Sequence, residues 1–192
     1  MSVPIRLVCF CIILLVDYQA QKTPSQIGKK TTPFSKGVAT SFLISVAALW
    51  GFAVFWLVNF GIAIGGNAVV LAPFLLSLIT LFFSGELFYL TRKRLAKDMQ
   101  GALLVLPIVV NLALSWQLDL ADSSLQGHNW LMYGVGILFF FVCSLLYFGI
   151  KERLKLSPIP DFLQGLPIQL TVLFLIFLSL SFFQGVFFGE LF

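Results

Sequence analysis

The chain has 192 residues, of which 59% are apolar and only 10% are charged, and its formal net charge is +4. A soluble globular domain carries about 25% charged residues, so this chain has too few polar side chains to cover a water-exposed surface. Only helices and closed barrels can span lipid, and the long apolar runs do not alternate with polar residues, which favours helices. The composition therefore predicts an all-α integral membrane protein. The basic residues form short clusters between apolar runs, a pattern that argues against nucleic-acid binding.

Six apolar segments follow one another along the chain, and a single membrane domain over residues 1–192 is expected. The segments cover residues 5–19, 38–64, 69–91, 102–116, 130–150 and 162–188. Crossing the bilayer core takes roughly 20 helical residues. The first and fourth segments are therefore predicted to be short, and the other four long enough to span. Two three-helix halves are expected, over about residues 1–97 and 98–192.

The positive charges predict the orientation of these segments. Eleven of the twelve Lys and Arg residues lie in three connections that fall on one side of a six-span arrangement: Lys22, Lys29, Lys30, Lys36, Arg92, Lys93, Arg94, Lys97, Lys151, Arg153 and Lys155. By the positive-inside rule this side is cytoplasmic, and both termini are outside. Three spans followed by three spans is the layout of inverted repeats. A short segment opening each half points to a functional centre near the middle of the membrane.

The first segment has a second interpretation. The stretch "MSVPIRLVCFCIILLVDYQAQ" also has the parts of a signal peptide, with Arg6, an apolar core and the small residue Ala20 near a plausible cleavage point. Cleavage would leave the basic residues from Lys22 to Lys36 outside, against the charge rule. A retained helix is therefore favoured, and the N-terminal sequence of the mature protein decides between the two.

Two carboxylates stand within or beside the apolar segments. Glu86 lies in "LFFSGELFYL", and a carboxylate in a membrane helix is costly and often functional. Because the basic residues from Arg92 to Arg94 follow within two turns, an ion pair at the membrane interface is the favoured alternative. Asp17 ends the first segment, and we expect it to be a solvated helix end.

Pro107 and Asn111 lie in the short fourth segment, "LLVLPIVVNLALSW". Proline interrupts the hydrogen-bond ladder of a helix, and Asn four residues later can satisfy freed backbone groups. A broken helix with a polar gap at mid-depth would suit an ion or cofactor site. A kink with a hydrogen bond between helices is an equally well supported interpretation.

Cysteine and histidine give no sign of a metal or catalytic site. Cys9, Cys11 and Cys143 lie in apolar stretches without a CxxC spacing, and Cys9 and Cys11 point to different faces of a helix. The single histidine, His128, is expected to be solvated in an acidic outer connection. No catalytic triad, metal constellation or phosphate-binding glycine loop can be assembled, so a self-contained enzyme site is not expected.

The segment "IKERLKLSPIPDFLQGLPI" resembles a segment of the membrane subunits shared by Rnf electron-transport complexes and the sodium-pumping NADH:quinone reductase (Nqr). The closest resemblance is to the A-type membrane subunits of Rnf and their E-type counterparts in the reductase. The matching residues are Lys151, Glu152, Arg153, Ile159, Pro160, Gln164 and Gly165, and we expect them to form a cytoplasmic loop motif. The resemblance extends over nearly the whole chain. It includes "KKTTPFSKGVATSFLISVAA", Glu86, "LPIVVN" with Pro107 and Asn111, and "LMYGVGILF".

The resemblance implies six helices in two inverted halves, both termini outside, and a place in the bacterial inner membrane. It also implies partners: membrane lipid and other membrane subunits, including a pseudosymmetric paralogue. In the family, two such subunits share a [2Fe–2S] cluster held by one cysteine from each first-helix region and one from each fourth helix. The corresponding positions here fall on Lys22 or Thr23 and on Leu112. None of these side chains can replace a thiolate, so no cofactor is expected on this chain and no metal ligand is assigned.

The sequence therefore predicts a divergent membrane subunit of an Rnf/Nqr-like redox-driven ion-translocating complex, without its own iron–sulfur ligands. It would be at most a non-catalytic or electron-relay subunit. Two alternatives stay open: a stand-alone transporter of an ion or small solute, and a non-catalytic assembly protein.

Overall fold

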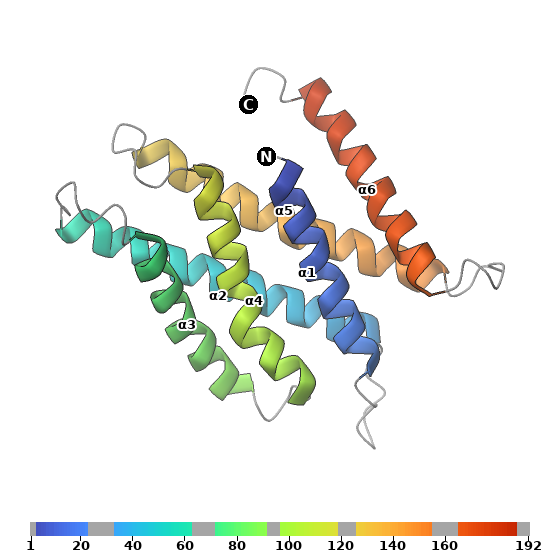
Figure 1. The fold of residues 1–192 in the computed structure, drawn as a ribbon, viewed down its shortest axis with the longest axis horizontal. Coiled ribbons are helices and arrows are strands. Elements are labelled where there is room, and N and C mark those ends of the chain that lie inside the picture. Colours follow the sequence, from blue (N-terminus) through green and yellow to red (C-terminus); the bar gives the residue numbers. More distant parts are fainter. Residues whose placement is uncertain are drawn as a thin grey trace.

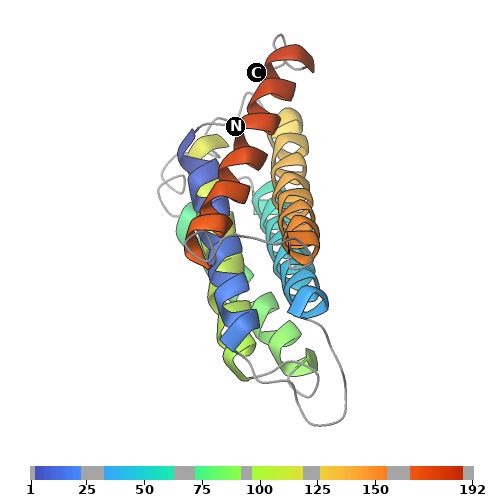
Figure 2. The ribbon, with the colours of Figure 1, turned by 90° about the vertical axis from the view of Figure 1, so that its right-hand side faces the viewer.

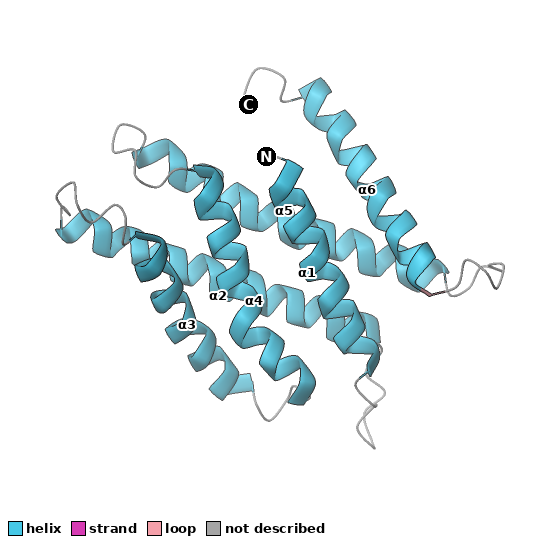
Figure 3. Cartoon of the chain, viewed as in Figure 1, coloured by secondary structure: helices cyan, strands magenta, loops and turns pink. Residues whose placement is uncertain are grey.

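A computed structural model describes residues 3–22, 33–62, 72–91, 97–118, 126–154 and 165–187 of the protein. Each of these ranges is a helix, apart from a turn at Gly165, so the all-α prediction is confirmed for the described part of the chain (Figure 3). The helices are α1 (Val3–Lys22), α2 (Pro33–Ile62), α3 (Ala72–Thr91), α4 (Lys97–Leu118), α5 (Gln126–Leu154) and α6 (Leu166–Phe187).

The sequence predicts short first and fourth helices, but neither helix is short. Helix α1 has 20 residues and α4 has 22, whereas α3 has 20. Backbone hydrogen bonding carries both helices beyond their apolar parts, since a helix does not have to end where its apolar residues end. The apolar parts themselves are short, Leu7–Gln21 and Gln100–Ser115.

Three helices are long and apolar enough to cross a membrane. Within the residues that the structure describes, they are Phe34–Val58 of α2, Ala72–Thr91 of α3 and Tyr133–Leu154 of α5. Helix α6 has 22 residues and no charged side chain, and within the described side chains its apolar stretch is Leu166–Ile176. These lengths and compositions agree with a membrane protein.

The helices form two layers (Figures 1 and 2). Helices α2 and α5 lie side by side and run in opposite directions, while α1 and α4 pack together across them. Helix α3 contacts α2 and α4 on one flank, and α6 contacts α5 and α1 on the other. Helix α1 is part of the core, because Ile12, Ile13 and Val16 on its inner face are almost completely buried.

Aromatic contacts establish the register of α2 against α5. Phe52 stacks on Tyr133, with ring centroids 3.6 Å apart and planes 7° from parallel. Near the other end of the pair, a Cβ atom at Gly37 would lie 2.5 Å from the Phe148 ring. From the first pair to the second, the residue number falls in α2 by as much as it rises in α5. This is expected for antiparallel helices that keep one register. Residues one turn inward from Gly37 and Phe148 therefore lie at the same level.

Candidate functional site

Asp17 is a buried carboxylate near the C-terminal end of α1. Only 3% of the residue is exposed. The prediction of a solvated helix end is wrong, because α1 continues through Lys22 and its inner face turns Asp17 into the bundle together with Ile13 and Val16. Positions three and four residues apart share one face of a helix, so the burial of these residues also buries the carboxylate.

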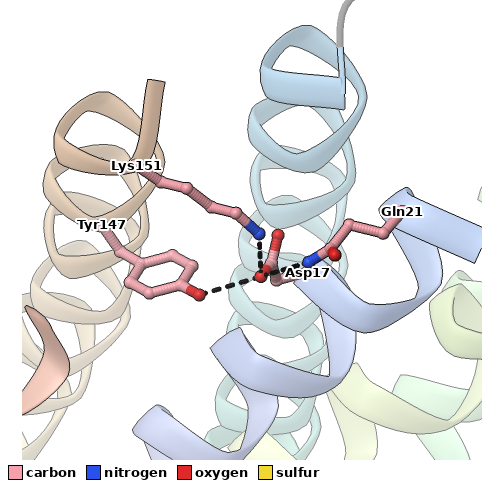
Figure 4. A network of polar contacts seen from close by, with 4 residues as sticks. All are labelled: Asp17, Gln21, Tyr147 and Lys151. Carbon is pink, nitrogen blue, oxygen red and sulfur yellow. Dashed lines mark hydrogen bonds and ion pairs between the residues drawn. The ribbon is translucent and has the colours of Figure 1, made fainter. Parts of the chain in front are cut away.

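Three donors converge on one oxygen of Asp17 (Figure 4). Gln21 Nε2 donates to Asp17 Oδ2 across one turn of α1 at 2.9 Å, and the Tyr147 hydroxyl of α5 donates to the same atom at 2.9 Å. Lys151 Nζ donates to it as well and forms an ion pair. Tyr147 and Lys151 are four residues apart, so they lie above one another on the face of α5 turned toward α1. The cluster joins the two predicted halves of the chain.

Lys151 belongs to a helix and not to a loop. The sequence placed Lys151, Glu152 and Arg153 in a loop motif after residue 150, but α5 continues to Leu154 and contains all three. Basic side chains in the last turn of a helix are favourable there, because the helix carries a partial negative charge at its C-terminus. Only Lys151 reaches Asp17; Glu152 is half-buried and Arg153 is exposed.

The other four residues of the predicted loop motif lie at or outside the edge of the described chain, and Ile159 and Gln164 are among those outside it. Gly165 directly precedes α6 with a φ of 89°, a conformation that glycine adopts without strain. Its carbonyl accepts a hydrogen bond from the Gln169 N–H at 3.4 Å. Gly165 is therefore the turn residue immediately before the first turn of α6. Pro160 lies outside the described residues.

Asn111 is the centre of a second polar cluster, which connects α2, α3, α4 and α5. Its Nδ2 donates to the Ala48 carbonyl of α2 at 3.1 Å and to Thr80 Oγ1 of α3 at 2.7 Å. The Tyr133 hydroxyl of α5 donates to Asn111 Oδ1 at 2.7 Å. The Thr80 hydroxyl donates to the Leu76 carbonyl at 2.7 Å, which leaves its oxygen as the acceptor for Asn111. All donors and the acceptor of the Asn111 side chain are in use, so this cluster holds helices together.

Pro107 lies inside a continuous helix. Helix α4 runs unbroken from Lys97 to Leu118 with Pro107 in its interior, so the structure does not contain the broken helix that was one of the two interpretations. The other interpretation, a hydrogen bond between helices at Asn111, is what the structure contains. Beside the proline, the Ser84 hydroxyl of α3 lies 3.3 Å from the Leu104 carbonyl, and this contact adds to the packing of α3 on α4.

Glu86 faces away from both polar clusters. It is exposed on α3, whereas Ser84 and Thr80 on the same helix are buried. The residues from Arg92 to Arg94, its predicted partners, lie outside the described residues. Both interpretations of Glu86 remain predictions.

The positions that the resemblance assigns to cluster cysteines lie on α1, on α4 or outside the described residues. Lys22 is the last residue of α1, Thr23 lies outside the described residues, and Leu112 is 38% exposed on the outer face of α4. Cys9 and Cys143 are buried and Cys11 is exposed, so Cys9 and Cys11 do lie on different faces of α1. In the described ranges no three His, Cys, Asp or Glu side chains group as metal ligands would. His128 lies in the first turn of α5.

Removing the Tyr133 hydroxyl should have a small effect. Tyr133→Phe keeps the stack on Phe52 and loses the hydroxyl contacts with Oδ1 and the backbone carbonyl of Asn111. Hydrogen bonds between membrane helices contribute on average about 0.6 kcal/mol. Tyr133→Leu also loses the stack and should be clearly less stable. Thermal unfolding of the two purified variants measures the difference. Equal losses would contradict a role for the ring.

Sequence reasoning missed the link between Asp17 and Lys151. The signals were present, since Tyr147 and Lys151 share a helix face, but the partners lie 134 residues apart in the chain. Comparison with known proteins adds no assignment to this geometry. No family model, no curated protein and no solved structure matches the chain.

Proposed function

We propose that the protein is a divergent membrane subunit of an Rnf/Nqr-like, redox-driven ion-translocating complex, and that it carries no iron–sulfur cluster of its own. The packing of the helices is the observation that carries this proposal. Helix α1 pairs with α4 and α2 pairs with α5, while α3 contacts α2 and α4, and α6 contacts α5 and α1. Exchanging α1–α3 with α4–α6 maps these contacts onto one another, as expected of two inverted three-helix halves. The further contact of α2 with α4 has no counterpart of similar extent between α5 and α1.

The polar core supports a scaffold role. Asn111 belongs to the motif "LPIVVN" that carries part of the resemblance. Its side chain is hydrogen-bonded to three other helices, and the next residue, Leu112, faces outward. Leucine cannot bind iron. The proposed subunit therefore holds its partners and contributes to the ion path, and electrons travel through the other subunits.

The proposed setting is the bacterial inner membrane, with both termini outside. Lys36 at the start of α2 and Lys151 and Arg153 at the end of α5 lie at the same end of the antiparallel helix pair, which the positive-inside rule places in the cytoplasm. The proposed partners are the surrounding lipid and other membrane subunits, among them a pseudosymmetric paralogue.

Copurification tests this proposal. The full-length protein, tagged and expressed from its own chromosomal locus, should bring down flavin-containing membrane partners from mild-detergent extracts. The isolated chain should contain no stoichiometric iron. A matched purification of an unrelated tagged membrane protein from the same strain is the control. A solitary protein without flavin-containing partners would overturn the proposed complex. Iron retained by the isolated chain would overturn the proposed absence of cluster ligands.

The partly buried ion pair between Asp17 and Lys151 favours a second candidate function, a stand-alone ion transporter. Ionisable residues inside a helical membrane bundle mark ion paths in many transporters. Purified protein in liposomes would then move an ion without partners, and Glu86→Gln would alter the flux only if Glu86 lies on the path. Absence of flux under any ion gradient would exclude this candidate. Reduced yield of an otherwise active complex in a deletion strain would point to an assembly protein.

A further inference from the structure

Two serines in the middle of the contact between α2 and α5 carry buried hydroxyls that make no hydrogen bond. Ser41 of α2 and Ser144 of α5 are both 0% exposed, and among the residues that the structure describes neither Oγ atom has a partner. A buried hydroxyl without a hydrogen bond is costly. Folded proteins satisfy nearly all such groups, either with protein atoms or with ordered water. The two serines therefore point to a further group that binds them.

The contacts between α2 and α5 place these two serines opposite each other. Ser41 is one turn after Gly37, and Ser144 is one turn before Phe148, so each serine shares a helix face with a residue of that contact. Three pairs along the two helices establish the register: Gly37 with Phe148, Phe42 with Phe141, and Phe52 with Tyr133. The serine level lies between the first and the last of these pairs. Ser41 and Ser144 thus face the same point of the seam between the helices.

Neither serine uses the partner that a helical hydroxyl normally finds. A serine or threonine in a helix can donate to a carbonyl three or four residues earlier. Hydroxyls elsewhere in the bundle do so, among them those of Thr40, Ser45, Thr80 and Ser179. Ser41 and Ser144 do not, and they form no direct bond with each other. Each hydroxyl can donate and accept, so one small group that also does both would satisfy the two serines together.

We propose that a single buried water molecule binds between Ser41 and Ser144 and links α2 to α5. Neither serine has a charged residue within one turn of its own helix, so the site suits a neutral ligand and not an ion. Two polar partners are enough to hold a buried water. The small residues Ser45 and Ala48 continue the same face of α2 and let the helices approach closely, which favours the smallest hydrogen-bonding ligand. This site goes beyond the proposed function, because it belongs to the scaffold of either candidate.

Thermal unfolding of full-length serine-to-alanine variants tests the site through the sign of the change. If the hydroxyls had no ligand, either substitution would remove an unsatisfied buried group and raise the unfolding midpoint. With the water bound, Ser41→Ala or Ser144→Ala removes one of its partners and leaves the other serine unsatisfied, so each variant should unfold at a lower midpoint. The double variant removes both hydroxyls and should lose no more than the larger single loss, a non-additive result.

Ser45→Ala is the matched control. Ser45 is buried one turn beyond Ser41 on the same face of α2, but its hydroxyl donates to the Ser41 carbonyl of its own helix. Ser45→Ala should therefore change the midpoint little, and its effect should add to that of Ser144→Ala.

Radiolytic hydroxyl-radical labelling identifies the ligand as water. A water held inside the bundle produces radicals where it is bound, so the wild-type peptide around Ser144 should be labelled although Ser144 is buried. Ser45→Ala should keep this labelling, and the variant with alanine at both Ser41 and Ser144 should lose it. A raised midpoint in either single variant, additive losses in the double variant, or an unlabelled wild-type peptide would overturn the proposal.

Coupled losses without labelling would also overturn the proposal, because they would show a direct bond between the two serines. If the double variant does not fold, the single variants and the labelling of the wild type decide. None of these measurements depends on copurification or ion flux, so failure of the water site and failure of the proposed function can be told apart.

Discussion

Gly51→Val is expected to separate α2 from α3 and to lower the free energy of unfolding markedly. A Cβ atom at Gly51 would lie 2.6 Å from Thr80 Oγ1 and 3.0 Å from the Thr80 Cα, which is backbone and cannot rotate away. Overpacking of this kind costs about 1–3 kcal/mol, occasionally more. Gly51→Ala should show a loss in that range, and valine, with two further carbons, a larger one. The displaced Thr80 would also lose its bond to Asn111.

Two other helical glycines provide matched controls for this experiment. A Cβ atom at Gly85 or Gly134 would meet nothing within 4 Å. Alanine favours a helix over glycine by about 1 kcal/mol, so Gly85→Ala and Gly134→Ala should be neutral or slightly stabilising. Chemical or thermal unfolding in one detergent compares all four variants. A Gly51→Ala protein as stable as the two controls would contradict the close approach of α2 and α3.

Asn111→Asp is expected to destabilise the bundle more than Asn111→Ala does. Aspartate has nearly the shape of asparagine but loses the two N–H donors, and it would place its second oxygen against the Ala48 carbonyl and Thr80 Oγ1, two acceptors. Alanine loses three hydrogen bonds, each worth on average about 0.6 and at most about 1.7 kcal/mol between membrane helices. It adds no repulsion and no buried charge. The order of stability should therefore be wild type, alanine, aspartate.

Leu112 offers the control for Asn111, because it is the next residue of α4 and faces outward. Leu112→Ala should change the unfolding midpoint much less than either substitution at Asn111. Measurement of all variants at neutral pH in the same detergent gives the comparison. If Asn111→Asp were as stable as the wild type, Asn111 would only fill space and the hydrogen-bonded cluster would not contribute to stability.

Much of the architecture was predictable because its causes are local. Helical segments follow from apolar runs, and their approximate positions agree with α1–α6. The helix ends were less accurate: α1 and α4 extend through polar residues, and α5 continues past residue 150 to Leu154. Hydropathy reports where side chains prefer lipid, whereas a helix ends where its backbone hydrogen bonds end. Because α5 extends past the predicted end, Lys151 lies in a helix and not in a loop, and it contacts Asp17.

The polar clusters were only partly predictable. Asn111 was recognised as a residue that could bond to another helix, and the structure identifies Ala48, Thr80 and Tyr133 as its partners. Asp17 was predicted to be solvated and is buried. The environment of Asp17 depends on the rotation of α1 about its axis relative to α5. No local sequence pattern specifies this rotation.

The all-helical class and the approximate positions of the helices follow from composition and hydropathy, because apolar content and backbone hydrogen bonding act over neighbouring residues. The contact of Asp17 with Lys151, the hydrogen bonds of Asn111 and the approach of Gly51 to Thr80 follow only from the packed bundle. Contacts between helices depend on the rotation and register of the helices. These are set by the packing of whole helix faces against one another, and not by the residues that precede or follow along the chain.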